Sequence, residues 1–275
     1  MLNRSKSRSA QRPKEMKKTA ERRRQLDHAV ARLCSLSEEE AAAMKEVNLF
    51  HWVCSMMKIS GSLLSKARIG AMLDGSTVRE ATVEEYRYLR SCVELYLEFR
   101  HMVEFDIYLD EKYIRKIHGV LAGNPSSEYR RSNPVLRDME YNPPHRSEIG
   151  ELMKAACREI ISDEHYEDRV GGAVRTHDMI MAVWPFEERN GETAYAAMSY
   201  ELLTAGYPLP ALDIDEKAHL TLAKEFVKSG ASHQLYAAVV DNLFEQCGGM
   251  QLGLSPNVPR QRRMRSAGAE TGNKG

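Results

Sequence analysis

Apolar residues recur every three or four positions along most of the chain, which is the spacing of amphipathic helices. Ser37 and Thr82 each precede a run that is acidic in its first turn, a pattern that marks the start of a helix. Only residues 127–142 have an extended pattern, so the sequence predicts an all-α fold class. The predicted helical segments are 19–33, 37–57, 82–97, 147–161, 168–183, 193–203, 213–226 and 232–244.

Composition fits a globular protein of 275 residues, 43% of them hydrophobic, which is enough for one large domain or two small ones. No apolar run approaches the length of a membrane span, and the N-terminus lacks a stretch of signal-peptide type. The five cysteines are scattered without a CxxC pair or metal-ligand spacing. Reduced thiols and a cytoplasmic location are therefore expected.

The formal net charge is zero, but the charges are unevenly placed. Residues 1–24 hold ten Lys/Arg against two Glu, and residues 260–275 hold five against one, which leaves 24 basic and 36 acidic residues between them. Because both ends are almost without apolar residues, we predict basic disordered tails at 1–24 and 251–275. They would flank an N-terminal helical segment (25–80) and a main domain (81–250). Solvated ends are the expectation, with contact to nucleic acid or an anionic membrane as alternatives.

The segment VWPFEERNGETAY, residues 183–195, predicts a functional loop between two helices. Pro185 can end the first helix, and Asn190-Gly191 is a turn signal. A loop that leads into a helix N-terminus offers free backbone N–H groups to an anion. Here, however, it carries three carboxylates that would repel a phosphate: Glu187, Glu188 and Glu192.

This loop resembles the signature of the Fic family, His-Pro-Phe-x-Asp/Glu-Gly-Asn-Gly-Arg-x-x-Arg. Five positions of the signature are kept: Pro185, Phe186, Glu188, Asn190 and Gly191. Four are replaced. Trp184 stands at the catalytic His, Arg189 at the first Gly, and Glu192 and Tyr195 at the two Arg.

The flanking sequence also resembles this family, in the right order over roughly residues 105–245. Tyr129 and Arg130 stand in the flap motif Gly-Lys-Tyr-Arg, and residues 141–144 match Tyr-x-Pro-Pro. His177 stands at another family position, and a structural role in the helix packing is expected for it. The resemblance implies a Fic-like helical bundle with a short β-hairpin flap.

The resemblance implies the activity of Fic proteins, which is transfer of AMP from ATP to a protein hydroxyl. In that reaction the motif His takes up the proton. Trp184 has no nitrogen that can do so. Glu192 places negative charge where an Arg would anchor phosphates, and such a reversal costs on the order of several kcal/mol in a partly buried site. Glu188 could still bind a divalent metal that bridges phosphates. The degenerate nucleotide-binding loop comprises Phe186, Glu188, Arg189, Asn190, Gly191, Glu192 and Tyr195.

Many Fic proteins also carry an inhibitory helix whose Glu pairs with the second motif Arg. The candidate region here is residues 59–68, where Lys66 or Arg68 would face Glu192. Our hypothesis is that one of these two cations is the partner of Glu192, so that the charges here are reversed relative to the family.

Two functions follow from the sequence. The first is a Fic-fold pseudoenzyme without cofactor that acts by binding a protein, as a regulator, a secreted effector or a toxin–antitoxin component. The alternative is an active protein adenylyltransferase, or another Fic-type transferase, that uses ATP and Mg²⁺ with non-standard residues.

Overall fold

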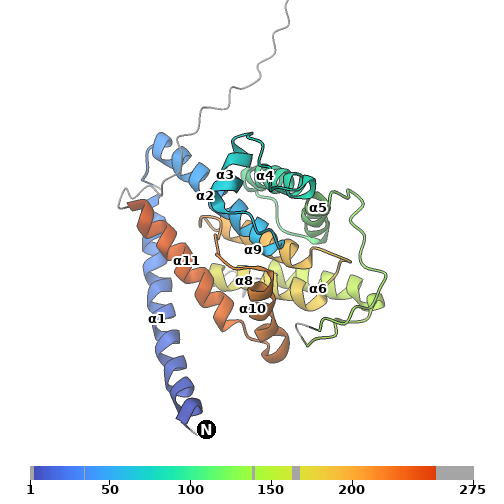
Figure 1. Cartoon of the computed structure of the whole chain (residues 1–275). Helices are drawn as coiled ribbons and strands as arrows, with labels where there is room; N and C mark the ends of the chain where they lie inside the picture. The colour runs from blue at the N-terminus through green and yellow to red at the C-terminus, as the bar shows by residue number, and fades with distance from the viewer. Residues whose placement is uncertain (1–2, 34, 138–139, 163–167, 252–275) are drawn as a thin grey trace, which may run out of the picture.

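The computed structural model describes residues 3–33, 35–137, 140–162 and 168–251. These residues form helices without a β-strand, so the predicted all-α fold class is confirmed (Figure 1). The helices are α1 (Asn3–Leu33), α2 (Glu38–Ile59), α3 (Lys66–Leu73), α4 (Val83–Glu104), α5 (Glu111–Ala122), the short 3₁₀ helix η1 (Arg146–Glu148), α6 (Ile149–Ile160), α8 (Arg169–Val183), α9 (Asn190–Thr204), α10 (Glu216–Ser229) and α11 (His233–Gln251).

Two of the helix starts form as their sequences predict. Ser37 and Thr82 are the N-caps of α2 and α4, and each makes a reciprocal capping box with a glutamate three residues later. These caps satisfy backbone N–H groups that the first helical turn leaves without partners.

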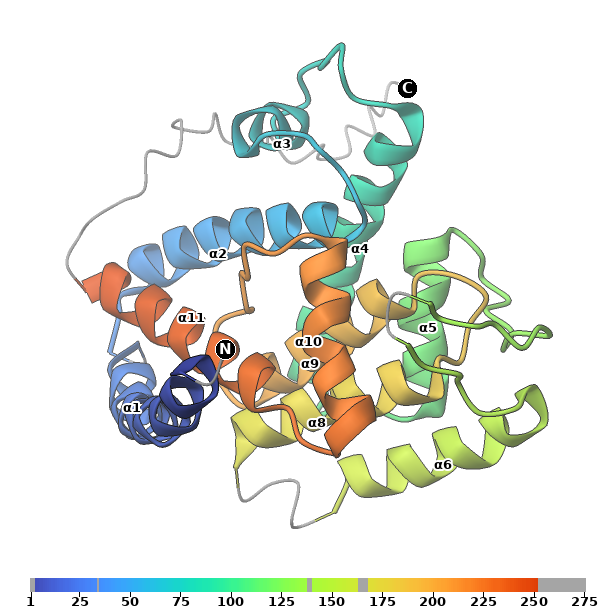
Figure 2. The same cartoon turned by 60° about the horizontal axis from the view of Figure 1, so that its bottom comes forward.

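α9 is the central helix of the fold. It packs against α8, α5, α4, α2 and α10, and α6 covers α8 on the other side (Figure 2). Every residue from Thr193 to Leu202 is buried, so this helix is enclosed on all sides. The start of α9 and the loop that leads into it are therefore held in place by the core.

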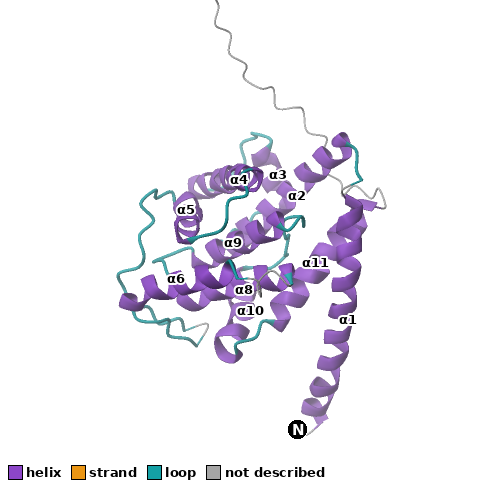
Figure 3. Cartoon of the chain, turned by 180° about the vertical axis from the view of Figure 1, so that it is seen from behind, coloured by secondary structure: helices purple, strands orange, loops and turns teal. Residues whose placement is uncertain are grey.

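α1 is the main difference from the sequence prediction. Residues 3–24, expected as a disordered tail, belong to one helix that continues to Leu33 and lies along α11 (Figures 1 and 3). Composition missed this because the basic residues near the end of α1 have acidic partners far away in the chain. Arg22 pairs with Asp241 at 2.5 Å and Arg23 with Asp168 at 3.1 Å, while Leu26 is fully buried. The predicted tail at 252–275 lies outside the described residues.

The predicted hairpin flap is reduced to a single antiparallel bridge between Leu136 and Tyr141 among the described residues. Pro134 has no N–H to donate to a ladder. The backbone before it is bonded elsewhere, because the N–H of Arg130 donates to the Pro185 carbonyl at 2.8 Å. The flap is thus an extended segment fastened to the loop.

Within the described part of the chain, no helix combines the length and the hydrophobicity that crossing a bilayer requires.

Packing of α1 on the body can be tested through Leu26, which has no exposed surface. We expect Leu26→Ala to lower the free energy of unfolding by about 2–4 kcal/mol, because it removes buried methyl groups and leaves a cavity. Chemical denaturation measures this loss. The matched control is Leu63→Ala, since Leu63 is 98% exposed and its truncation should change stability by less than about 0.5 kcal/mol. Equal stability of the two variants would show that α1 does not pack as described.

Candidate functional site

The loop between α8 and α9 begins with a sharp change of direction at Trp184. Trp184 adopts the left-handed conformation (φ 49°) that often ends a helix, and its N–H donates to the Ile180 carbonyl at 2.8 Å. Pro185 follows, and it could not have continued the helical hydrogen bonding. The loop ends at Arg189, which is also left-handed (φ 54°) and directly precedes α9.

Phe186 and Asn190 hold the loop closed from inside. The Asn190 side chain accepts from the Phe186 N–H and donates to the Phe186 carbonyl, both at 2.9 Å. Phe186 has no exposed surface and stacks on the His118 ring with centroids 3.8 Å apart. Burial lowers the pKa of His118 to about 4, against a smaller opposing effect of the Glu188 backbone. These residues form the structural framework of the loop.

Arg130 fastens the flap to the outside of the same loop. Its Nε donates to the Trp184 carbonyl at 2.7 Å, and its guanidinium also reaches the carbonyls of Ser132 and Pro144. Only 3% of Arg130 is exposed. The flap arginine is therefore used to hold backbone carbonyls. Its neighbour Tyr129 lies partly buried beside Phe186, with ring centroids 5.7 Å apart.

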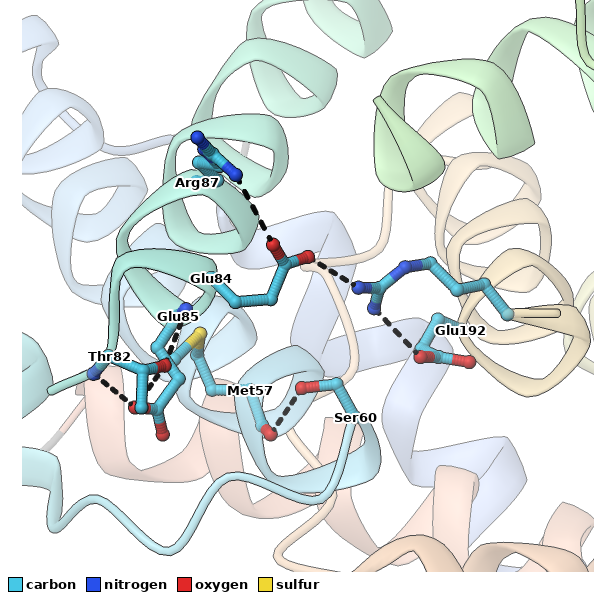
Figure 4. Close-up of polar contacts among 8 residues, drawn as sticks. Met57, Ser60, Thr82, Glu84, Glu85, Arg87 and Glu192 are labelled. Carbon is cyan, nitrogen blue, oxygen red and sulfur yellow. Dashed lines mark hydrogen bonds and ion pairs between the residues drawn. The ribbon is translucent and has the colours of Figure 1, made fainter. Parts of the chain in front are cut away.

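Arg189 and Glu192 form an ion pair at the start of α9, and this pair decides the electrostatics of the site. An Arg189 NH1 lies 3.3 Å from Glu192 Oε1, and its NH2 lies 3.1 Å from Glu84 Oε1 on α4 (Figure 4). The guanidinium also lies over the Tyr88 ring, 4.6 Å from its centroid. The Arg189 and Glu192 side chains are only 17% and 13% exposed. The residue at the family's first Gly thus neutralises the residue at the family's first Arg.

Glu192 lies in the first turn of α9, where a helix favours negative charge. Burial raises the pKa of Glu192 above its ordinary value, while the N–H of its own residue and Arg189 act in the opposite direction. The part of the loop that would receive a phosphate therefore already holds a carboxylate of the chain itself.

A cavity of about 520 Å³ opens beside this pair. Trp184, Glu188 and Glu192 line it from the loop side, Ile59 from the end of α2, and Glu216 and His219 from α10. Trp184 is half-buried. Tyr195 does not line the cavity. It lies in the core, and its hydroxyl donates to the Pro210 carbonyl at 2.8 Å.

His219 was not anticipated from the sequence. Its Nε2 lies 2.7 Å from His177 Nε2, and His177 Nδ1 lies 3.0 Å from Asp178 Oδ1. All three side chains are buried, which agrees with the structural role expected for His177. Gly191 fits closely against His219, because a Cβ at this position would lie 3.2 Å from His219 Nδ1. The sequence separation of 42 residues between the two histidines explains why no local pattern indicated the contact.

The hypothesis that Lys66 or Arg68 faces Glu192 was wrong. Arg68 pairs with Glu80 at 2.8 Å, and the cation beside Glu192 is Arg189. The helix end that reaches the cavity is that of α2, at Ile59.

Glu188 is exposed at the rim of the cavity and offers a single carboxylate to a metal ion. The described residues contain no group of three or more His, Cys, Asp or Glu side chains placed to hold a metal. A Mg²⁺ ion at Glu188 would need most of its remaining ligands from phosphates and water.

Residues 108–202, which include the loop, match the sequence model of the Fic/DOC family. Over these residues the chain is similar to Fic/DOC-family domains. Its fold is similar to Fic-1 (residues 134–508) from C. elegans, with a TM-score of 0.70 and 16% identity over 91% of this chain and 79% of that one. It is also similar to a Fic domain containing signaling protein from Bacteroides thetaiotaomicron, with a TM-score of 0.69 and 15% identity over 83% and 98% of the two chains. A search of curated proteins finds no match.

Glu192 can be tested by the pH dependence of stability. Its pKa is raised from an ordinary value of 4.5 by burial, so the folded protein holds the proton more tightly than the unfolded chain. As the pH rises above about 4.5, the unfolded chain ionises first and the wild type loses stability. We expect Glu192→Gln to remove this loss, so that the stability of the variant minus that of the wild type increases between about pH 4 and pH 7.

Urea unfolding across this range measures the difference. The control is Glu188→Gln, which changes an exposed neighbour on the same loop and should leave the pH dependence as in the wild type. A Glu192→Gln curve parallel to that of the wild type would contradict the burial of this carboxylate.

Proposed function

We propose that this Fic-domain protein does not transfer AMP and acts instead by binding another protein. The observation that carries the proposal is the Arg189–Glu192 pair at the start of α9. Fic-domain proteins usually transfer AMP to proteins, and their signature has an Arg at the position of Glu192. A triphosphate would have to displace a buried carboxylate there, and like charges at contact distance in such a site cost on the order of several kcal/mol.

The absence of a proton acceptor at Trp184 supports the same proposal, because an indole N–H only donates. His118 is covered by Phe186, and burial lowers its pKa to about 4. His219 lies beneath Gly191, and burial lowers its pKa well below its ordinary value, so it is a weak base. Neither histidine stands at the motif position of the family His, which Trp184 occupies.

The residues that hold the loop backbone in place are nevertheless kept. This favours a binding role over a segment that has lost its function. The Phe186–Asn190 bonds and the Arg130 contacts hold the flap and the loop as one rigid surface. A rigid surface loses little conformational entropy when a partner binds. A regulator, a secreted effector or a toxin–antitoxin component would each use such a surface. The described cysteines are free thiols, which suits the expected cytoplasmic location.

Nucleotide binding distinguishes this proposal from the alternative, an adenylyltransferase with non-standard residues. We expect isothermal titration of the wild type with ATP and Mg²⁺ to give no binding heat, and incubation with α-labelled ATP to give no labelled protein. The double variant Arg189→Gly with Glu192→Arg should improve ATP affinity by about tenfold or more, because it restores both a close backbone approach and a cation.

The control is Glu245→Gln on α11, which makes the same net change in charge by removing one carboxylate but lies outside the cavity. Thermal unfolding of each variant confirms that it is folded. Micromolar ATP binding by the wild type, or transfer of label to protein by the wild type, would overturn the proposal in favour of an enzyme.

A further inference from the structure

We propose that the cavity beside the loop binds a guanidinium group, the side chain of an arginine of the partner protein. This inference rests on the proposed function, since it assigns a ligand class to the same surface. It reverses the chemistry of the family site, which receives an anionic phosphate.

The charge of the cavity favours a cation. Three carboxylates line it, those of Glu188, Glu192 and Glu216, against the arginines Arg137 and Arg189. Arg189 is already engaged by Glu192 and by Glu84, and Arg137 is exposed on the flap. Glu188 and Glu216 are exposed, and neither has an ion-pair partner among the described residues. Two carboxylates are thus left to receive a ligand.

His219 gives an independent indication of the same ligand class. An ionised Asp178 can only accept, and His177 Nδ1 would then carry the proton toward it, which would make His177 Nε2 an acceptor. His219 Nε2 must then donate to His177, which leaves His219 Nδ1 with a free lone pair. His219 is 1% exposed and lines the cavity, and its Nδ1 has no hydrogen-bond partner among the described residues. This lone pair belongs to a residue that lines the cavity, so it can accept from a donor of a ligand or of water.

The apolar part of the wall suits a planar cation on an aliphatic stem. Trp184 lines the cavity, and a guanidinium stacks favourably on an indole ring. Ile59 and Leu220 line the cavity as well and can cover methylene groups. A metal ion fits less well, because the described part of the chain lacks three ligating side chains in one group. Arginine provides five N–H donors for the carboxylates and the imidazole.

The test is a ¹H–¹⁵N NMR titration of the full chain with Nα-acetyl-arginine amide, observed at the tryptophan indole N–H groups. The chain has two tryptophans, and Trp52 is a built-in reference because it is fully buried and bonded to Ser199 Oγ. We expect the Trp184 signal to shift saturably with a dissociation constant in roughly the millimolar range, ordinary for a ligand of this size. The Trp52 signal should stay in place. Nα-acetyl-citrulline amide, the neutral isostere, should give no saturable shift.

Glu188→Gln and Glu216→Gln should each weaken arginine binding by about twofold to fivefold, as for exposed ion pairs. Glu245→Gln on α11 is the control with the same change of charge and should bind as the wild type. Equal shifts with the citrulline compound, or no shift of a well-resolved Trp184 signal, would overturn this inference alone. A Trp184 shift on addition of ATP with Mg²⁺ would instead contradict the proposed function, so the two failures are distinguishable.

Discussion

The start of α9 is the constraint on which the rest of the site depends. α9 is enclosed by other helices along most of its length, and the polar groups of its first turn need partners where water is largely excluded. In this chain the carboxylate of Glu192 lies in that turn, and Arg189 supplies the opposite charge from the residue just before the helix. Because Arg189 is also held by Glu84 and lies over Tyr88, the pair is tied to α4. In the proposed function, a phosphate at this turn would have to compete with these contacts.

The fold of the loop and its chemistry depend on different residues, which is why one could change without the other. Phe186, Asn190 and Arg130 set the backbone path through bonds to backbone groups. None of these bonds involves the side chain of Trp184 or Glu192. Substitutions at those two positions therefore alter charge and proton transfer while leaving the loop in place. Under the proposed function, the loop backbone is therefore kept while the charge at the start of α9 is reversed.

Local signals carried most of what could be predicted from the sequence. The capping boxes at Ser37 and Thr82, the helical periodicity and the loop position all depend on residues within a few positions of one another. The contacts that the sequence did not reveal are long-range. Arg189 meets Glu84 across 105 residues, and α1 gains order from acidic partners on α11 and beside α8. Composition alone describes α1 as a solvated tail because it does not register which charges have partners.

The most direct test of this account is a crystal structure of the chain grown with ATP and Mg²⁺ at high concentration. We predict that the Glu192 carboxylate remains at the start of α9 beside Arg189, with no ordered phosphate against the backbone of residues 187–193. Density for a triphosphate on that backbone, with Glu192 turned out and Arg189 released from Glu84, would contradict it.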